Sequence, residues 1–419
     1  MKLAGNDMLI QSLINEGVEY IFGYPGGAAL HIYDAIFKQK EMQHILVRHE
    51  QGATHAADGY ARATGKPGVV MVTSGPGATN AITGIATAFM DSIPMIVISG
   101  QVQSHLIGTD AFQETDMIGI SRPIVKHSFT VDHQENIPTI VKEAFHIATS
   151  GRQGPVVIDI PKDLTNPDEL FDYEYPKKVS IRSYNPPVEP EQNQVDRVIS
   201  ALKESKRPVI YAGGGTIASN ASDELRELNS YIKVPVTNTL MGLGVYPGTD
   251  KYFLGMLGMH GTYQANMAMH NADLILAIGA RFDDRITNTP SKFAPKAKIV
   301  HFDVDHSSVS KIIEADIAVF GQVKNSLQAI NEKLKLESEE FDEGRFTDWH
   351  NQIADWRKSH GLNHELYLEV DDSKPILPQA AVQRIYQASD GKAFVTSDVG
   401  QHQMFAAQYY HFDEPRKWI

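Results

Sequence analysis

Helix-type and strand-type hydrophobic patterns alternate through residues 7–160. Apolar residues between Leu9 and Ile14 recur at helical spacing and predict one buried helix face, which Gly17 would end. Unbroken apolar runs, such as Gly-Val-Val-Met-Val-Thr at residues 68–73, instead predict strands that are buried on both faces. Strands that alternate with helices predict an α/β fold, in which a parallel sheet has helices on both faces. Strands are expected at residues 18–22, 44–48, 68–73, 95–99 and 155–160, and helices at residues 51–64 and 78–90.

The same patterns divide the chain into successive units. A proline-rich, polar stretch at residues 162–190 predicts a linker, and a second α/β unit follows. The charged segment 336–373 is expected to be a connector with one helix. A third unit starts near residue 375, and because about 45 residues are too few to close a domain, we expect it to be incomplete. The expected domains are 1–165, 190–335 and 375–419, with further strands at 209–212, 274–279, 299–304, 317–320 and 393–397 and a helix at 378–387.

Composition narrows the class of protein. The 419-residue chain has a formal net charge of −13, which argues against a surface for nucleic acid or for anionic membranes. It contains no cysteine, which excludes disulfides, thiolate catalysis and thiolate metal sites and fits a cytoplasmic protein. No apolar run approaches the length of about 18 residues that a membrane span needs, and polar residues such as Asp7 interrupt the N-terminal segment where a signal peptide would have its apolar core.

Glu50 is the most informative residue for function. It follows the predicted strand 44–48 and precedes an Ala- and Gly-rich helix at residues 51–64. A carboxyl group buried in an apolar pocket keeps its proton more readily and can then donate a hydrogen bond to a heterocycle nitrogen. Two simpler interpretations are a salt bridge with Arg48 and an acid that favours the helix N-terminus.

Other polar or glycine-rich segments also follow predicted strands, where α/β sheets bind their ligands. The turn 74–77 could present backbone N–H groups, Gln113 offers an amide in a loop, and Gly-Gly-Gly at 213–215 suits a phosphate. Arg281 and Arg285 could pair with a diphosphate. The simpler interpretations are a tight turn, a surface loop and Arg–Asp pairs within one loop. The histidines show no metal-ligand spacing, which favours structural roles for them.

Taken together, these segments resemble the catalytic subunits of biosynthetic acetolactate (acetohydroxyacid) synthases, a family of thiamine-diphosphate enzymes. The resemblance keeps the family's order over nearly the whole chain. The matching segments are residues 22–27, 48–53, 73–80, 110–114, 151–155, 161–163, 256–261, 279–285 and 398–403.

The resemblance implies a thiamine-diphosphate-binding fold followed by a central α/β domain that contacts FAD. It implies that Glu50 hydrogen-bonds N1′ of the cofactor's aminopyrimidine ring and so promotes loss of the thiazolium C2 proton. Gly27 and Gln113 would lie beside the reactive carbon. The other implied thiamine-diphosphate contacts are Pro76, Asn80, Gln401 and His402. The implied FAD contacts are Arg152, Thr239, Leu240, His260, Arg281, Arg285 and Asp303.

The chain also departs from the family pattern. Gln322 stands where relatives usually have Asp near the adenosine side of FAD. The segment that holds Mg2+ on the diphosphate is expected beyond Ile419, so no metal ligand is assigned within the chain.

The implied reaction decarboxylates pyruvate and joins the two-carbon unit to a second 2-keto acid, pyruvate or 2-oxobutyrate, in branched-chain amino-acid biosynthesis. The implied assembly is a homodimer or tetramer with a small regulatory subunit. Two alternatives remain open: a flavin-dependent pyruvate oxidase on the same scaffold, and an inactive truncated chain that binds nucleotide or dimerises.

Overall fold

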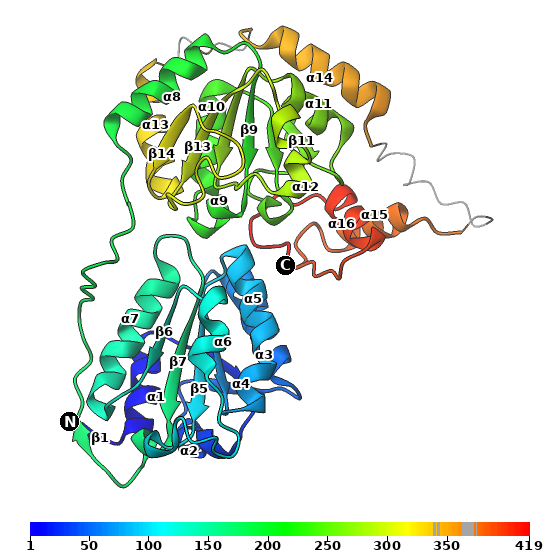
Figure 1. Cartoon of the computed structure of the whole chain (residues 1–419). Helices are drawn as coiled ribbons and strands as arrows, with labels where there is room; N and C mark the ends of the chain where they lie inside the picture. The colour runs from blue at the N-terminus through cyan, green and yellow to red at the C-terminus, as the bar shows by residue number, and fades with distance from the viewer. Residues whose placement is uncertain (338–340, 342–343, 363–372, 374) are drawn as a thin grey trace. The chain divides into compact units, whose positions relative to one another are not determined.

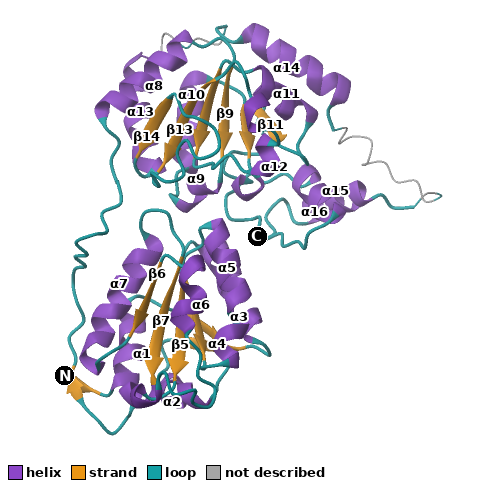
Figure 2. Cartoon of the chain, in the orientation of Figure 1, coloured by secondary structure: helices purple, strands orange, loops and turns teal. Residues whose placement is uncertain are grey.

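The computed structural model describes residues 1–337, 341, 344–362, 373 and 375–419 (Figure 1). The chain forms two compact units, Met1–Asn185 and Pro186–Ile419, and each contains a six-stranded parallel sheet. Helices cover the sheets in both units, as the α/β pattern predicts (Figure 2). Among the described residues, no helix combines the length and the apolar character that crossing a membrane requires.

In the first unit the strand order is β3-β2-β4-β5-β7-β6, and a separate antiparallel pair joins β1 to β8. The strands are β1 Lys2–Leu3, β2 Tyr20–Gly23, β3 Gln43–Leu46, β4 Gly68–Val72, β5 Met95–Gln101, β6 His127–Thr130, β7 Pro155–Pro161 and β8 Phe171–Asp172. The helices are α1 Gly5–Asn15, α2 Leu30–Lys38, α3 Glu50–Thr64, α4 Pro76–Asn80, α5 Ile82–Asp91, α6 Met117–Ser121 and α7 Ile137–Thr149.

Strand β4 shows why its sequence is apolar at every position. Val69 and Met71 belong to a core cluster with residues of α1, α2 and α7. Val70 and Val72 point to the opposite face and pack in a second cluster with residues of α3 and α5. Alternate side chains of a strand face opposite sides of the sheet, so a strand covered on both sides must be apolar throughout.

Two expectations in this unit need correction, and one strand was missed. The single helix expected at 78–90 is two helices, α4 and α5, and α4 starts at Pro76, because proline is favoured in the first turn of a helix. The polar stretch expected as a linker contributes β8, which pairs with β1. The short edge strand β6 was not expected, since its residues do not form an apolar run.

In the second unit the strand order is β11-β10-β9-β12-β13-β14. The strands are β9 Pro208–Ala212, β10 Val236–Asn238, β11 Phe253–Met256, β12 Leu274–Ile278, β13 Lys298–Asp303 and β14 Ile317–Phe320. The helices are α8 Gln192–Glu204, α9 Gly214–Ala218, α10 Ser222–Ile232, α11 Tyr263–Asn271, α12 Asp284–Thr287, α13 Val323–Glu337, α14 Thr347–His360, α15 Pro378–Ala388 and α16 Gln401–Tyr409.

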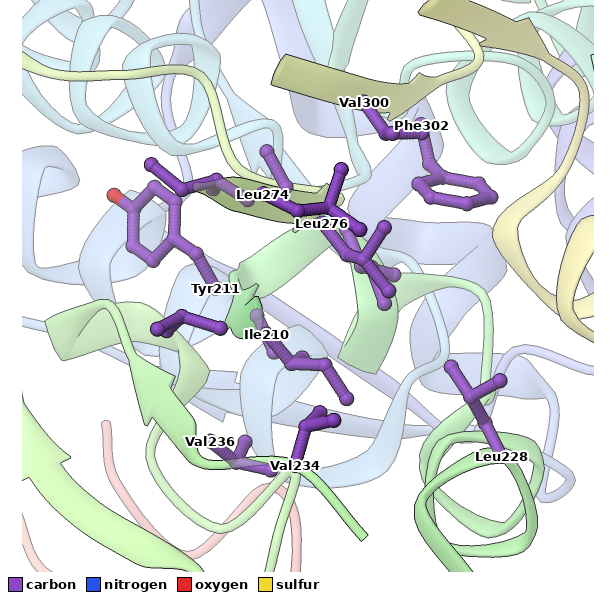
Figure 3. Close-up of a cluster of buried hydrophobic side chains, with 14 of the residues drawn as sticks. Ile210, Tyr211, Leu228, Val234, Val236, Leu274, Leu276, Val300 and Phe302 are labelled. Atoms are coloured by element: carbon purple, nitrogen blue, oxygen red, sulfur yellow. The ribbon is translucent and has the colours of Figure 1, made fainter. Parts of the chain in front are cut away.

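One hydrophobic core joins the second unit's sheet to its helices. Figure 3 shows its centre, where Ile210, Leu274 and Phe302 of three neighbouring strands lie near Leu228 of α10. The segment expected as a connector also contributes, because Trp349 of α14 is 2% exposed in this core. Part of that expected connector, at residues 338–340, 342–343 and 363–372, lies outside the described residues.

The last described segment, 375–419, packs against the rest of the second unit. Tyr410, Phe412 and Trp418 form a small core with Leu243 and Met256. The strand expected at residues 393–397 is wrong, because a strand needs a partner along its length. Within the described part of the chain, a bridge from Val395 to Trp418 is the only pairing made there. The three domain boundaries expected from the sequence stay a prediction.

Asp159 on β7 is a buried carboxyl group, 3% exposed. Burial raises the pKa of Asp159 to about 6 from its usual 3.8, although a hydrogen bond from Gln101 partly offsets the effect. Between these two values the folded protein holds more protons than the unfolded chain. The free energy of unfolding should therefore fall as the pH rises through this window, by about 3 kcal/mol in total.

We expect Asp159→Asn to remove this pH dependence. Urea unfolding between pH 4 and 7 should show that the free energy of unfolding of the variant increases relative to that of the wild type as the pH rises. Asp168→Asn, which removes a carboxylate from an exposed position, is the control. Parallel pH profiles for wild type and Asp159→Asn would contradict the prediction.

Candidate functional site

Glu50 lies at the carboxyl end of the first unit's sheet. It is the first residue of α3, and its side chain is 8% exposed. Its Oε2 accepts a hydrogen bond of 2.9 Å from the Nδ2 of Asn80. Among the described residues, no ion pair joins Glu50 to Arg48, so that simpler interpretation is wrong. The helix-start interpretation holds for the position of Glu50, but it does not explain why the side chain is buried.

Thr73, just after β4, connects two glycine turns to this carboxyl group. Its Oγ1 accepts a 3.2 Å hydrogen bond from the backbone N–H of Ala28. A Cβ at Gly26 would lie 2.4 Å from the Thr73 methyl, and one at Gly77 would lie 2.7 Å from the same methyl and 3.3 Å from Glu50 Oε1. Only glycine fits at these contacts, so the turns after β2 and β4 come together beside Glu50.

Gly27 borders open space. A Cβ built on it would meet no atom within 4 Å, in contrast to its neighbour Gly26. Gly27 begins a short 3-10 helix, Gly27–Ala29, that leads into α2. The site therefore has a backbone wall with room beside it, which suits a planar ring that must approach the chain closely.

Gln113 also reaches this edge of the sheet. A Cβ on Gly75 would lie 2.6 Å from the carbonyl oxygen of Gln113, so the two backbones are packed together. Both residues have left-handed φ angles, +59° at Gly75 and +60° at Gln113. Such a φ is strained for a residue other than glycine and is common at functional sites. The side chain of Gln113 is exposed, and so is Pro76 at the start of α4.

Two contributors escaped the sequence analysis, Thr73 and Tyr33. The Tyr33 hydroxyl on α2 donates a 3.0 Å hydrogen bond to the carbonyl of Met71. Burial, and next the nearby charge of Glu50, raise the pKa of Tyr33 well above its usual value. Tyr33 lies outside the matching segments, and Thr73 lies in the matching segment 73–80 but was assigned no role there. The position of Thr73 directly before the 74–77 turn was the available signal for it.

In the second unit, several residues expected to contact FAD follow the strands. Thr239 comes after β10, Arg281 after β12, and Asp303 ends β13. The Oγ1 of Thr239 is buried and has no hydrogen-bond partner among the described residues. Asp303 Oδ2 lies 3.7 Å from His301 Nε2, but burial lowers the pKa of His301 to about 4, so this histidine is neutral at pH 7. Asp303 therefore has no charged partner in His301, and its Oδ1 accepts a 2.9 Å hydrogen bond from the N–H of Asp305.

The simpler interpretation of Arg281 and Arg285, that they pair with Asp residues of their own loop, is confirmed by their contacts. Arg281 lies 3.4 Å from Asp283, and Arg285 lies 3.9 Å from Asp284, both within one loop. Arg285 is 73% exposed at its side chain, so its ion pair is weak. An anionic ligand could compete for such an arginine at little cost.

The glycines at 213–215 have a packing role. A Cβ on Gly213 would lie 2.4 Å from the carbonyl oxygen of Gly279, and one on Gly215 would lie 2.8 Å from its Cα. The loops after β9 and β12 thus pack backbone to backbone. This contact accounts for Gly213 and Gly215 without a phosphate, whereas a Cβ on Gly214 would fit with its nearest neighbour at 3.4 Å.

The remaining predicted residues lie on separate elements. Gln401 and His402 are exposed at the start of α16, and Gln408 of that helix donates a 2.7 Å hydrogen bond to the carbonyl of His260. Leu240 packs against the small core around Tyr410. Arg152 belongs to the first unit, where its Nε donates to the Ser92 hydroxyl at 2.8 Å.

Comparison with known protein families agrees with the division into these two sheets. Residues 3–120 match the thiamine pyrophosphate enzyme N-terminal TPP binding domain, and residues 195–330 match the central domain of the same enzymes. The first match contains Glu50, Asn80 and the glycine turns.

Individual relatives show which family of thiamine pyrophosphate enzymes the chain resembles. The chain is 54% identical over 420 residues to the acetolactate synthase large subunit of Haemophilus influenzae, and 53% identical over 417 residues to the acetolactate synthase isozyme 3 large subunit of Escherichia coli. Each alignment covers 100% of this chain and 72% of the relative. The chloroplastic acetolactate synthase of Arabidopsis thaliana is 43% identical, over 99% of this chain and 61% of its own length. The chain belongs to the acetolactate synthase large-subunit family.

Proposed function

We propose that this chain is the catalytic subunit of an acetolactate synthase, which decarboxylates pyruvate and joins the two-carbon unit to a second 2-keto acid. The second acid is pyruvate or 2-oxobutyrate, and the products feed valine, leucine and isoleucine biosynthesis. The family membership and the buried carboxyl group of Glu50 support this assignment.

The single observation that carries the proposal is the setting of Glu50. Its carboxyl group is buried, its Oε2 is held by Asn80, and glycine turns leave room beside it. This arrangement fits the aminopyrimidine ring of thiamine diphosphate, which when bound supplies the carbon centre that carries the two-carbon unit. Glu50 holds a proton toward the ring nitrogen N1′, and Asn80 fixes the direction of the carboxyl group.

The other first-unit residues have supporting roles. Gly27 keeps the backbone wall free of a side chain where the reacting groups lie. Pro76 lines the ring pocket, and the Gln113 amide can both donate and accept hydrogen bonds beside the reacting carbon. Gln401 and His402 are proposed contacts of the diphosphate, and Mg2+ is proposed to bind there through ligands outside residues 1–419.

FAD is the second proposed cofactor. Among its proposed contacts, Thr239 has a hydroxyl oxygen without a hydrogen-bond partner in the described part of the chain, and Arg285 has a weak ion pair. Asp303, at the end of β13, is a further proposed contact. Leu240, His260, Arg281 and Arg152 complete the proposed set. Gln322, in the position where Asp is usual, would offer an amide in place of a carboxylate. The flavin has no redox role in the proposed reaction.

We further propose a cytoplasmic homodimer or tetramer with a small regulatory subunit. The bacterial relatives are named large subunits, which supports a smaller partner.

The proposal is tested with purified protein, thiamine diphosphate, Mg2+ and pyruvate. Formation of acetolactate, without rapid bleaching of bound flavin under anaerobic conditions, is the expected result. Rapid anaerobic bleaching by pyruvate would instead identify a pyruvate oxidase. Calorimetry with thiamine diphosphate and Mg2+ separates a third possibility, because an inactive chain with half a site would show no tight, Mg2+-dependent binding.

A further inference from the structure

The loop of residues 102–116 carries Gln113 from β5 to α6. Apart from one turn of 3-10 helix, Ser104–Leu106, it has no regular structure. Such a loop does not by itself hold a strained residue in one place. Yet the backbone of Gln113 is packed against Gly75 with φ at +60°. Contacts elsewhere must stabilise this conformation.

The side chain of Gln101, the last residue of β5, ties the two ends of this loop together. It is 4% exposed. Its Oε1 accepts a 2.8 Å hydrogen bond from the N–H of Val102, and its Nε2 donates at 2.7 Å to the carbonyl of Thr115. The same Nε2 donates at 3.1 Å to Asp159 Oδ2 on β7. One buried amide therefore fixes the loop's first residue and its last turn to the sheet.

Asp159 completes this anchor. It is buried, and within the described residues no cation pairs with it. A buried carboxyl group without a cation is unfavourable, so its presence calls for a compensating role. The hydrogen bond from Gln101 provides that role, because Asp159 orients the amide that holds the loop.

Glu114 stabilises a turn within the same loop. Its carboxylate accepts hydrogen bonds from the N–H groups of Gly108 and Ala111, the latter at 2.9 Å. These bonds lower the pKa of Glu114. Gln113 therefore lies next to a residue that is fixed to the loop's own turn, and two residues before the carbonyl that Gln101 holds.

We propose that Gln101 and Asp159 are positioning residues, which anchor loop 102–116 to β7 so that the amide of Gln113 stays beside the Gly75 turn. The effect on catalysis rests on the role proposed above for Gln113. The effect on the conformation of the loop does not depend on that role.

Hydrogen exchange tests the anchor without any assay of activity. Gln101→Met keeps the length of the side chain and removes its donors. Exchange in the peptide spanning 102–116 should become about tenfold faster, as expected for the loss of one or two net hydrogen bonds. Gln103→Met is the matched control, because Gln103 is an exposed glutamine in the same loop. Equal exchange rates in Gln101→Met and wild type would overturn the proposal.

A double-mutant cycle tests the link to Gln113. Gln101→Met should lower kcat about tenfold in the wild type and have almost no further effect in a Gln113→Ala background, because residues that act through one another are not additive. Equal effects in both backgrounds would overturn the positioning role. Absence of acetolactate formation in wild type would count against the proposed function, and the exchange result would still decide on the anchor.

Two further variants protect the test against misfolding. Asp159→Asn keeps an oxygen that accepts from Gln101 and should leave loop exchange within about twofold of wild type. The pair Gln101→Met with Asp159→Leu removes both side-chain partners, so that no buried carboxyl group is left without its hydrogen bond from Gln101, and should still loosen the loop. A tightly protected loop in this pair would contradict the anchor.

Discussion

Glu50→Gln should lower the rate of acetolactate formation at least about 100-fold, which is the lower range for losing a general acid–base group. The substitution keeps the size of the side chain and an oxygen that can accept from Asn80, so the folded structure should persist. It removes the proton that the carboxyl group exchanges with the ring nitrogen. The measurement is the steady-state rate with pyruvate at saturating thiamine diphosphate and Mg2+.

Glu41→Gln is the control for this experiment, because Glu41 is exposed and precedes β3 on the surface. It should retain the wild-type rate. Urea unfolding should give free energies of unfolding for Glu50→Gln and wild type that agree within about 1 kcal/mol. An unchanged rate in Glu50→Gln would remove the basis of the proposed mechanism.

Trp349→Ala should destabilise the second unit by about 3–5 kcal/mol, the usual cost of truncating a large buried aromatic residue. Trp349 is 2% exposed and stands edge-on to Trp356, with ring centroids 5.7 Å apart. Its Nε1 also donates a 3.1 Å hydrogen bond to the carbonyl of Pro208, at the start of β9. The substitution would leave a cavity and an unpaired carbonyl.

Urea unfolding followed by far-UV circular dichroism measures this loss. Trp349→Phe should recover most of the stability, because it keeps an aromatic ring and loses only the hydrogen bond and part of the volume. Trp356→Ala should cost less, since Trp356 is only partly buried. A loss below about 1 kcal/mol in Trp349→Ala would show that α14 does not stabilise the sheet.

Continuous apolar strands were predictable from the sequence because both faces of each sheet are covered. The predictions for β4 and β12 match the structure closely for this reason. The short strands β10 and β11 were missed, since three or four residues with Asn238 or Gly255 among them give no clear period. Burial of Trp349 was missed because it lies in a segment dominated by charge.

The candidate site was partly predictable for a related reason. Glu50 and the glycine turns follow strands, and the carboxyl ends of parallel strands meet at one edge of a sheet. The contacts that complete the site join distant parts of the chain. Gln101 and Asp159 are 58 residues apart, and no local pattern relates them. The roles of Thr73 and Tyr33 depend in the same way on tertiary packing.

Thr73 gives this site a particular limit on variation. Its methyl group fills the space that a side chain at Gly26 or Gly77 would need. A side chain at Gly77 is therefore conditional on loss of the Thr73 methyl. A Cβ at Gly26 would also lie 2.6 Å from the Cβ of Thr73, so an alanine at Gly26 becomes tolerable only alongside glycine at position 73. Engineering that widens or reshapes this pocket has to treat the three positions as a single coupled unit, since changes made one at a time would be rejected for reasons unrelated to catalysis.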